Sequence, residues 1–175
     1  MAYWLSQYPT LAEFGIAGYG NLSVNQSLGE EYFGGFGGIF LLPVLSPANT
    51  SDSLAAAVLP IVEKIQEIWP GLFLSENSST SYDSFYDWWL PNNGPDYAGI
   101  DIMAGSRLLD VEALTANLTA LKVALQGASA NSGLQIDLVS GKGVWNAKPR
   151  GGSDSVNPAW RKALIHVSKC QLHPR

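Results

Sequence analysis

The sequence is poor in cysteine, in charge and in long apolar runs. Its one cysteine, Cys170, cannot form an internal disulfide, which argues against a small disulfide-stapled scaffold. Charged residues make up only 14%, and the ten Lys and Arg are spread along the chain instead of forming the basic surface that phosphate backbones require. The longest apolar run, Ile39 to Leu45, is far shorter than the roughly 18–20 residues that span a bilayer. We therefore expect neither a nucleic-acid partner nor a membrane.

The N-terminus lacks the basic start and apolar core of a signal peptide. Five of the ten asparagines nevertheless stand in Asn-x-Ser/Thr, where chance predicts about 1.3. This excess favours a secreted glycoprotein whose N-terminal segment is missing. A polar, serine-rich surface is the alternative. The candidate glycosylation sites are Asn21, Asn25, Asn49, Asn77 and Asn117.

A chain of 175 residues with 46% hydrophobic content is sufficient for one domain with its own core. Residues 134–139 and 99–104 alternate between apolar and polar side chains, as half-buried strands do. Further strands are predicted at 18–24, 39–45 and 163–167, helices at 1–14, 51–69 and 110–127, and a glycine-rich loop at 25–38. The pattern predicts an α+β fold, a mostly antiparallel sheet with helices on one face.

The other face of this sheet is the first candidate site. The residues expected opposite the apolar rows are Asp101, Met103, Gln135, Asp137 and either His166 or its neighbours. If the strands are adjacent, carboxylates and an imidazole share one surface, which suits a substrate floor with acid and base groups. An ordinary solvated face is the alternative.

Aromatic side chains supply two further candidates. Trp145, Trp160 and Arg161 stand on the two sides of a Gly- and Lys-rich loop. They line a pocket for a planar or sugar-like ligand, or the two tryptophans cap the core. A second cluster either lines an entrance or belongs to core and rim: Tyr82, Tyr86, Trp88 and Trp89.

Other chemistries find no support. Gly34 to Gly38 precede a strand instead of opening a helix, so they make a poor phosphate cradle. Cys170 and His173 could each bind zinc, but a zinc site needs three or four protein ligands and the nearby sequence supplies no others. We expect no metal. A Gly-x-Ser-x-Gly elbow is missing as well, so nucleophilic catalysis is not indicated.

Four segments, in order, carry a family resemblance. They are Phe14 to Gly20 (FGIAGYG), Phe40 to Leu45 (FLLPVL), Gly105 to Leu109 (GSRLL) and Asn157 to Arg161 (NPAWR) with the strand that follows. Together they resemble the substrate-binding domain of fungal FAD-linked oxidoreductases of the berberine-bridge-enzyme-like group, within the vanillyl-alcohol-oxidase superfamily. The resemblance covers residues 1–167, and residues 168–175 are expected to be an unstructured tail.

The resemblance implies FAD as cofactor, a small organic or carbohydrate-like substrate and secretion of the intact relative. It also implies two partner segments that this sequence does not match, an FAD-binding domain and a berberine-like C-terminal segment. No catalytic or flavin-binding residue is carried over. Substrate-binding candidates are Asp101, Met103, Asp137, Trp145, Trp160 and Arg161. Two hypotheses remain: a fragment of an oxidoreductase, inactive alone, or a secreted non-catalytic glycoprotein or binding module that has kept the fold.

Overall fold

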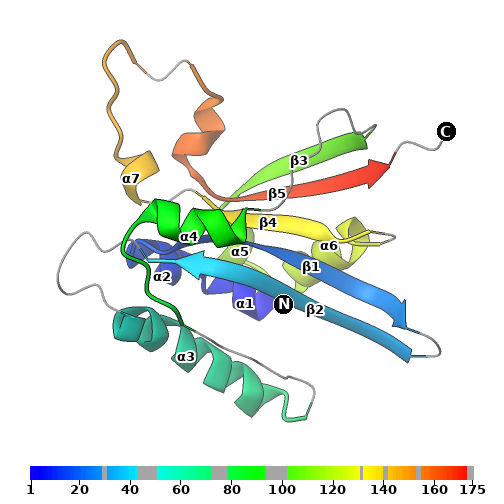
Figure 1. Cartoon of the computed structure of the whole chain (residues 1–175). Helices are drawn as coiled ribbons and strands as arrows, with labels where there is room; N and C mark the ends of the chain where they lie inside the picture. Colours follow the sequence, from blue (N-terminus) through cyan, green and yellow to red (C-terminus); the bar gives the residue numbers. More distant parts are fainter. Residues whose placement is uncertain are drawn as a thin grey trace.

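The chain forms a five-stranded antiparallel sheet with helices packed against it (Figure 1). The computed structural model describes residues 1–28, 31–42, 51–71, 79–93, 102–130, 132–139, 142–152 and 155–172. The strands are β1 (Ala17–Leu28), β2 (Glu31–Leu41), β3 (Ile102–Asp110), β4 (Leu134–Leu138) and β5 (Ala163–Leu172). The helices are α1 (Ala2–Ser6), α2 (Tyr8–Glu13), α3 (Ser51–Ile68), α4 (Phe85–Asn92), α5 (Val111–Thr115), α6 (Leu118–Ala128), α7 (Lys142–Trp145) and the 3-10 helix η1 (Pro158–Arg161).

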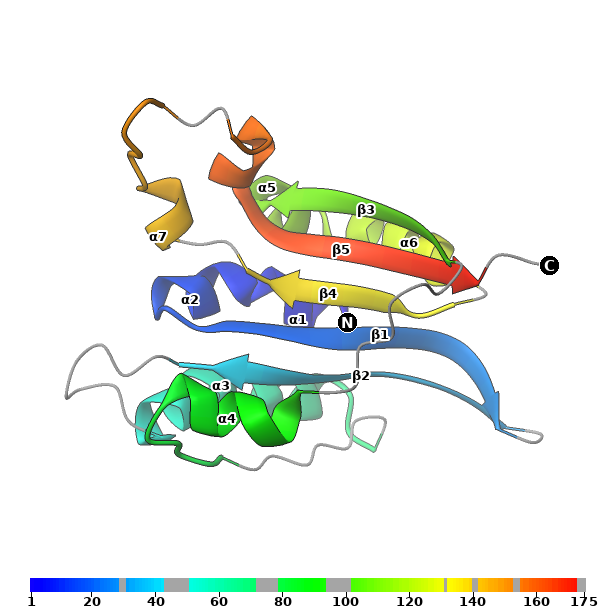
Figure 2. The ribbon, with the colours of Figure 1, turned by 45° about the horizontal axis from the view of Figure 1, so that its top comes forward.

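The strands lie in the order β2-β1-β4-β5-β3, so the last strand of the chain stands between β4 and β3 (Figure 2). The predicted α+β class with a mostly antiparallel sheet is confirmed. Helices α1, α2, α3, α5 and α6 contribute buried side chains to a single apolar cluster with β1, β4 and β5. Helix α4 differs, because it lies over the opposite face of the sheet (Figures 1 and 2).

The alternation in β4 decides which face is covered. Leu134, Ile136 and Leu138 are buried against the helices, whereas Gln135 is exposed and Asp137 is partly exposed. Neighbouring β1 repeats the pattern with Leu22 on the buried side. Since side chains of one strand alternate between faces, the polar positions of the sheet share the other surface.

The glycine-rich segment is a strand, so the predicted loop at 25–38 is wrong. Residues of β2 pair with β1 from Ala17↔Leu41 to Leu28↔Glu31, with an irregularity between Ser23 and Gln26. Phe36 and Phe40 pack against the ring of Trp4, at centroid distances of 6.2 and 5.7 Å. The glycines leave room for these rings, since a Cβ on Gly20 would meet the ring of Phe36. Tertiary packing thus overrides the low strand propensity of glycine.

The last strand also extends further than the sequence indicates. Residues 168–172 belong to β5 and pair with β3, so the predicted unstructured tail is wrong over this part; 173–175 lie outside the described residues. Lys169 fixes the strand to α6, because its Nζ donates to the carbonyl oxygens of Ala128 and Ala130 at 2.8 Å each. A cation at the C-terminal end of a helix donates to the free carbonyl groups and interacts favourably with the negative end of the helix dipole.

The single helix predicted at 110–127 is two helices. Asp110 caps α5 by accepting from the N–H of Ala113, and Asn117 caps α6 by accepting from the N–H of Ala120, both at 2.9 Å. Gly127 lies inside α6 instead of stopping it. Asn117 therefore starts a new helix because its side chain replaces a missing intrahelical partner.

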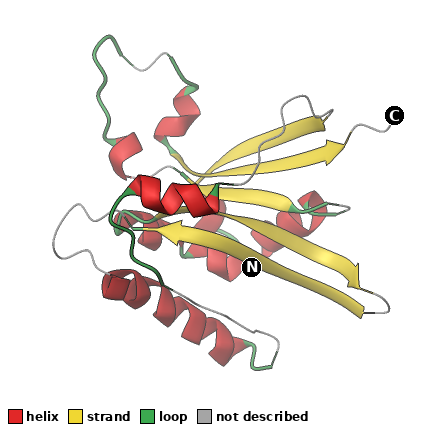
Figure 3. Cartoon of the chain, viewed as in Figure 1, coloured by secondary structure: helices red, strands yellow, loops and turns green. Residues whose placement is uncertain are grey.

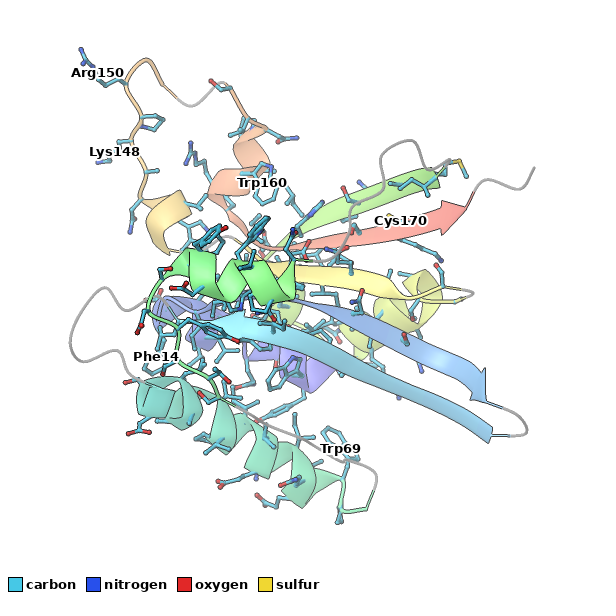
Figure 4. All side chains as sticks on the ribbon, in the orientation of Figure 1. Phe14, Trp69, Lys148, Arg150, Trp160 and Cys170 are labelled. Atoms are coloured by element: carbon cyan, nitrogen blue, oxygen red, sulfur yellow. The ribbon has the colours of Figure 1, made fainter. Side chains whose placement is uncertain are left out.

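An arm projects from one end of the sheet between α7 and η1 (Figure 3). Two hydrogen bonds close its base: Trp145 Nε1 donates to the Ala163 carbonyl at 2.7 Å, and Arg161 Nη1 donates to the Val144 carbonyl at 2.9 Å. Lys148 and Arg150 extend outward from the arm (Figure 4). The described helices include none long and apolar enough to cross a membrane.

Candidate functional site

A row of side chains crosses the sheet on the face opposite the helical core, which we name the polar face. Register places Tyr19 of β1 beside Asp137 of β4, and Asp137 beside His166 of β5. The next row holds Asn21, Gln135 and Ser168. The predicted sharing of one surface by Gln135, Asp137 and His166 is therefore confirmed.

Asp137 is the centre of the polar contacts in this row. Its Oδ1 accepts from Gln135 Nε2 at 3.1 Å, and its Oδ2 lies 3.6 Å from His166 Nδ1. The Asp137 side chain is 13% exposed and the His166 side chain 29%, so both are shielded but reachable from solvent. A carboxylate beside one ring nitrogen favours a proton on that nitrogen and leaves the other nitrogen free to accept one.

Trp160 of η1 completes the surroundings of the imidazole. Its ring lies 5.7 Å from the ring of His166, tilted by 49°. The asparagine of the NPAWR motif sets η1 in place, because Asn157 Oδ1 accepts from the N–H of Ala159 at 2.9 Å. The NPAWR motif therefore positions an aromatic ring beside His166 of the polar face.

A shallow, open groove of about 310 Å³ lies between α4 and the polar face. Phe85 and Trp88 of α4 form its upper side, and Tyr19 and Asp137 belong to the sheet side. Ser84 caps α4 by accepting from the N–H of Asp87 at 3.1 Å. The remaining lining residues are Ala17, Gly18, Leu41, Gln135, Leu138 and Val139.

The other predicted site residues are distributed differently. Met103 pairs with Gln171, out of step with Ala104 and Cys170, so it lies on the face that carries the helices and not beside Asp137. The expectation that Met103 shares the acid-base surface is wrong, because β3 enters the sheet one residue out of the predicted alternation. Asp101 lies outside the described residues.

The predicted wall of Trp145, Trp160 and Arg161 is only partly assembled. Trp145 packs against the core cluster, and its indole N–H is used on the Ala163 carbonyl. Arg161 is used on the Val144 carbonyl. Trp160 is the member of the three whose ring packs against the His166 ring in the described structure. A substrate-binding role for each stays a prediction.

The aromatic cluster at residues 82–90 does not belong to the buried core, and an entrance-lining role for its members stays a prediction. Helix α4 has no buried residue, and Tyr86 is 63% exposed. Trp88 faces the groove together with Phe85, a residue that the sequence analysis did not select. The sequence analysis did not select Tyr19 either. Tyr19 is exposed between buried Gly18 and Gly20, so the alternation along β1 places it on the polar face.

The candidate glycosylation sites fall in different settings. Asn21 lies on the polar face beside Gln135, and Asn117 caps α6. Asn25 belongs to β1, while Asn49 and Asn77 lie outside the described residues. The part of the chain that the structure describes contains no group of three or more His, Cys, Asp or Glu side chains suited to a metal ion.

Comparison with known proteins extends the description of the fold. No protein-family model matches the chain, and no curated protein matches it. The solved structure of the VAO-type flavoprotein MtVAO713 from Myceliophthora thermophila C1 aligns over 97% of this chain with a TM-score of 0.78 and 22% identity. The chain has the fold of part of that flavoprotein. It spans 30% of the neighbour's length.

Proposed function

We propose that this chain is the substrate-binding part of an FAD-linked oxidoreductase of the vanillyl-alcohol-oxidase superfamily. The observation that carries the proposal is the fold likeness to a VAO-type flavoprotein over 97% of the chain. The polar face supports it, since a protein that reacts a substrate with a cofactor must present orienting and proton-accepting groups on one surface. The narrower assignment, to the fungal berberine-bridge-enzyme-like group, rests on the four resembling segments.

The described residues suit only part of what FAD requires. The glycine-rich segment is a strand and does not open a helix, so it offers no backbone cradle for the pyrophosphate. The polar face with Asp137 and His166 fits a position next to a substrate instead. We therefore assign pyrophosphate binding to a separate FAD-binding domain, the missing partner, and assign substrate orientation to this chain.

In this division of work, the hydride-accepting chemistry would be supplied by FAD held in the partner domain. The chain's own residues form the floor: the groove under α4 receives a small organic or carbohydrate-like molecule, Phe85 and Trp88 exclude water from one side, and Asp137 and Gln135 orient polar groups. Alone, the chain is expected to be inactive. The intact protein is proposed to be secreted.

Flavin absorbance tests the proposal. The purified 175-residue chain, incubated with FAD and desalted, is expected to be colourless, because the glycine-rich segment among its described residues offers no cradle for the pyrophosphate. Sequencing of the gene on both sides is expected to reveal an FAD-binding domain in frame or across an intron. The chain fused to that domain should retain flavin in a one-to-one ratio. A yellow isolated chain with stoichiometric flavin would contradict the proposed division.

The alternative, a secreted non-catalytic glycoprotein or binding module, is supported by the excess of Asn-x-Ser/Thr sites. Asn21 separates the two proposals. It lies in the middle of the polar face, so a glycan attached there would occupy the surface that a substrate needs. Mass spectrometry of the secreted protein gives the answer: a glycan on Asn21 favours the glycoprotein, whereas an unmodified Asn21 beside modified sites elsewhere favours the substrate floor.

A further inference from the structure

The arm between α7 and η1 ends in an exposed basic tip. Residues 146–152 are all exposed, and Arg150 points away from the body of the molecule (Figure 4). The Gly152 N–H donates to the Pro149 carbonyl at 3.2 Å, which closes a four-residue turn with Arg150 at its second position. Gly151 and Gly152 have φ angles of 83° and 95°, and a Cβ on either would meet nothing within 4 Å. The turn therefore presents Arg150 and the peptide bond after it to open space.

The chain that leads into this turn is close to the conformation that endopeptidases bind, which is an extended strand. Pro149 has a fixed φ, and it restricts the preceding Lys148 to the extended region of conformational space. Opening the tip breaks the hydrogen bond between Gly152 and Pro149 but uncovers no buried side chain, since residues 146–152 are exposed already. Exposed loop tips of this kind are the preferred sites of proteolytic cleavage.

We propose that the peptide bond between Arg150 and Gly151 is a processing site for a trypsin-like endopeptidase, and that the cleaved chain stays folded as a two-chain protein. In such enzymes a carboxylate in the primary pocket selects the basic side chain before the cut. The inference goes beyond the proposed function and does not depend on flavin.

The step is a hydrolysis, and water is its co-reactant. The bond from the Arg150 carbonyl carbon to the Gly151 nitrogen breaks. Water supplies a hydroxyl group to that carbon and a proton to that nitrogen. Arg150 then ends in a carboxylate and Gly151 begins with an amino group, and nothing is oxidised or reduced.

The other basic residues are poorer sites for the same enzyme. Lys148 precedes Pro149, and a trypsin-like active site does not accept the ring nitrogen of proline after the cut. Lys162 is the C-cap of η1, and its N–H donates to the Ala159 carbonyl at 3.0 Å. Arg175 lies outside the described residues. The remaining six lie within helices or strands, where cleavage requires local unfolding: Lys64, Arg107, Lys122, Lys142, Arg161 and Lys169.

The segment after the cut is held in the sheet by contacts that the cut does not touch. It contains β5, which pairs with β4 on one side and with β3 on the other. Leu164 and Ile165 of this strand are 0% exposed, so its release would uncover core side chains. Trp145, before the cut, also donates to the carbonyl of Ala163, after it, at 2.7 Å. The two pieces should therefore stay together after hydrolysis.

Limited digestion of the whole 175-residue chain with trypsin tests the cleavage. We expect one early cut, with products 1–150 and 151–175 identified by mass spectrometry. Arg150→Gln should slow the first cut at least about tenfold, because the other described sites lie in regular structure or precede proline. Arg150→Lys should restore it. Lys122→Gln removes an exposed cation from α6 and is the matched control, which should leave the first cut unchanged.

Two further measurements test the assembly and the use of the site. The products should elute together in size-exclusion chromatography with an unchanged circular dichroism spectrum, and should separate only in denaturant. Protein purified from its own source, with no protease added, should contain chains that begin at Gly151.

Three results would overturn the inference. They are equal rates of the first cut in the wild type and in Arg150→Gln, products that separate without denaturant, and source-purified protein that is intact between Arg150 and Gly151. None of these results bears on flavin retention by the fused protein, so failure here is distinguishable from failure of the proposed function.

Discussion

At the scale of single residues, Tyr8 is a described group whose acidity is altered by burial. It is 1% exposed and packs edge-on against Trp4 and Phe40. Burial raises the pKa of its phenol above the usual value; the neighbouring Trp4 side chain opposes this shift, and the Asp137 carboxylate adds to it. Burial in the apolar core therefore favours the neutral form of the Tyr8 phenol.

This raised pKa predicts a loss of stability at alkaline pH. The unfolded chain ionises Tyr8 near pH 10, whereas the folded chain keeps the proton, so the contribution is fully present below about pH 10 and is lost as the pH rises further. Tyr8→Phe should flatten this decline. Urea midpoints between about pH 8 and 11 measure it. Parallel declines in wild type and variant would show that Tyr8 ionises normally.

Asn117 combines a helix cap with a candidate glycosylation site. Its side chain accepts from the N–H of Ala120 at 2.9 Å. Asn117→Ala should destabilise the protein by about 1 kcal/mol, whereas Asn117→Asp keeps the acceptor and should cost little. Thr119→Ala abolishes the glycosylation signal without changing the cap and is the matched control. Chemical unfolding of the unglycosylated proteins gives the values; equal stability of the Ala and Asp variants would remove the capping role.

At the scale of elements, the β1–β2 hairpin contains glycines where an added side chain would clash and glycines where it would meet open space. A Cβ on Gly20 would meet the ring of Phe36 and approach the carbonyl oxygen of Gly37 to 2.8 Å, whereas a Cβ on Gly37 would meet nothing within 4 Å. Gly20→Ala should therefore cost about 1–3 kcal/mol, and Gly37→Ala should be neutral or slightly stabilising. Urea unfolding compares the two. Equal effects would mean that Phe36 can move aside.

The same hairpin shows where sequence patterns were insufficient. The amphipathic helix at 51–69 and the alternating strand at 134–139 were predicted within one residue, because each has a clear period and clear ends. The β2 strand was not, because its glycines carry no period and its stability comes from Phe36 and Phe40 packing on distant Trp4. Partner strands and the rings around a site are long-range features. The sequence pattern therefore identified Asp137, but its contact with His166 and its place in the groove required the fold.

At the scale of the whole molecule, one apolar cluster joins the two ends of the chain. Leu5 and Leu11 from α1 and α2 belong to the same buried cluster as Ile165 of β5. The sheet order reinforces this connection, because β5 is inserted between β4 and β3. The polar face is therefore supported by segments from both ends, and damage to the N-terminal helices should reach His166 through the sheet.

Leu5→Ala tests this coupling. Leu5 is 1% exposed, so its truncation should cost about 2–5 kcal/mol. Since the cluster is continuous, circular dichroism and tryptophan fluorescence should both report one transition, shifted by the same amount. Val123→Ala on α6, where the side chain is 63% exposed, is the control and should change stability by less than about 0.5 kcal/mol. Two separate transitions in the Leu5 variant would mean that α1 and α2 unfold independently, leaving the sheet and its polar face intact.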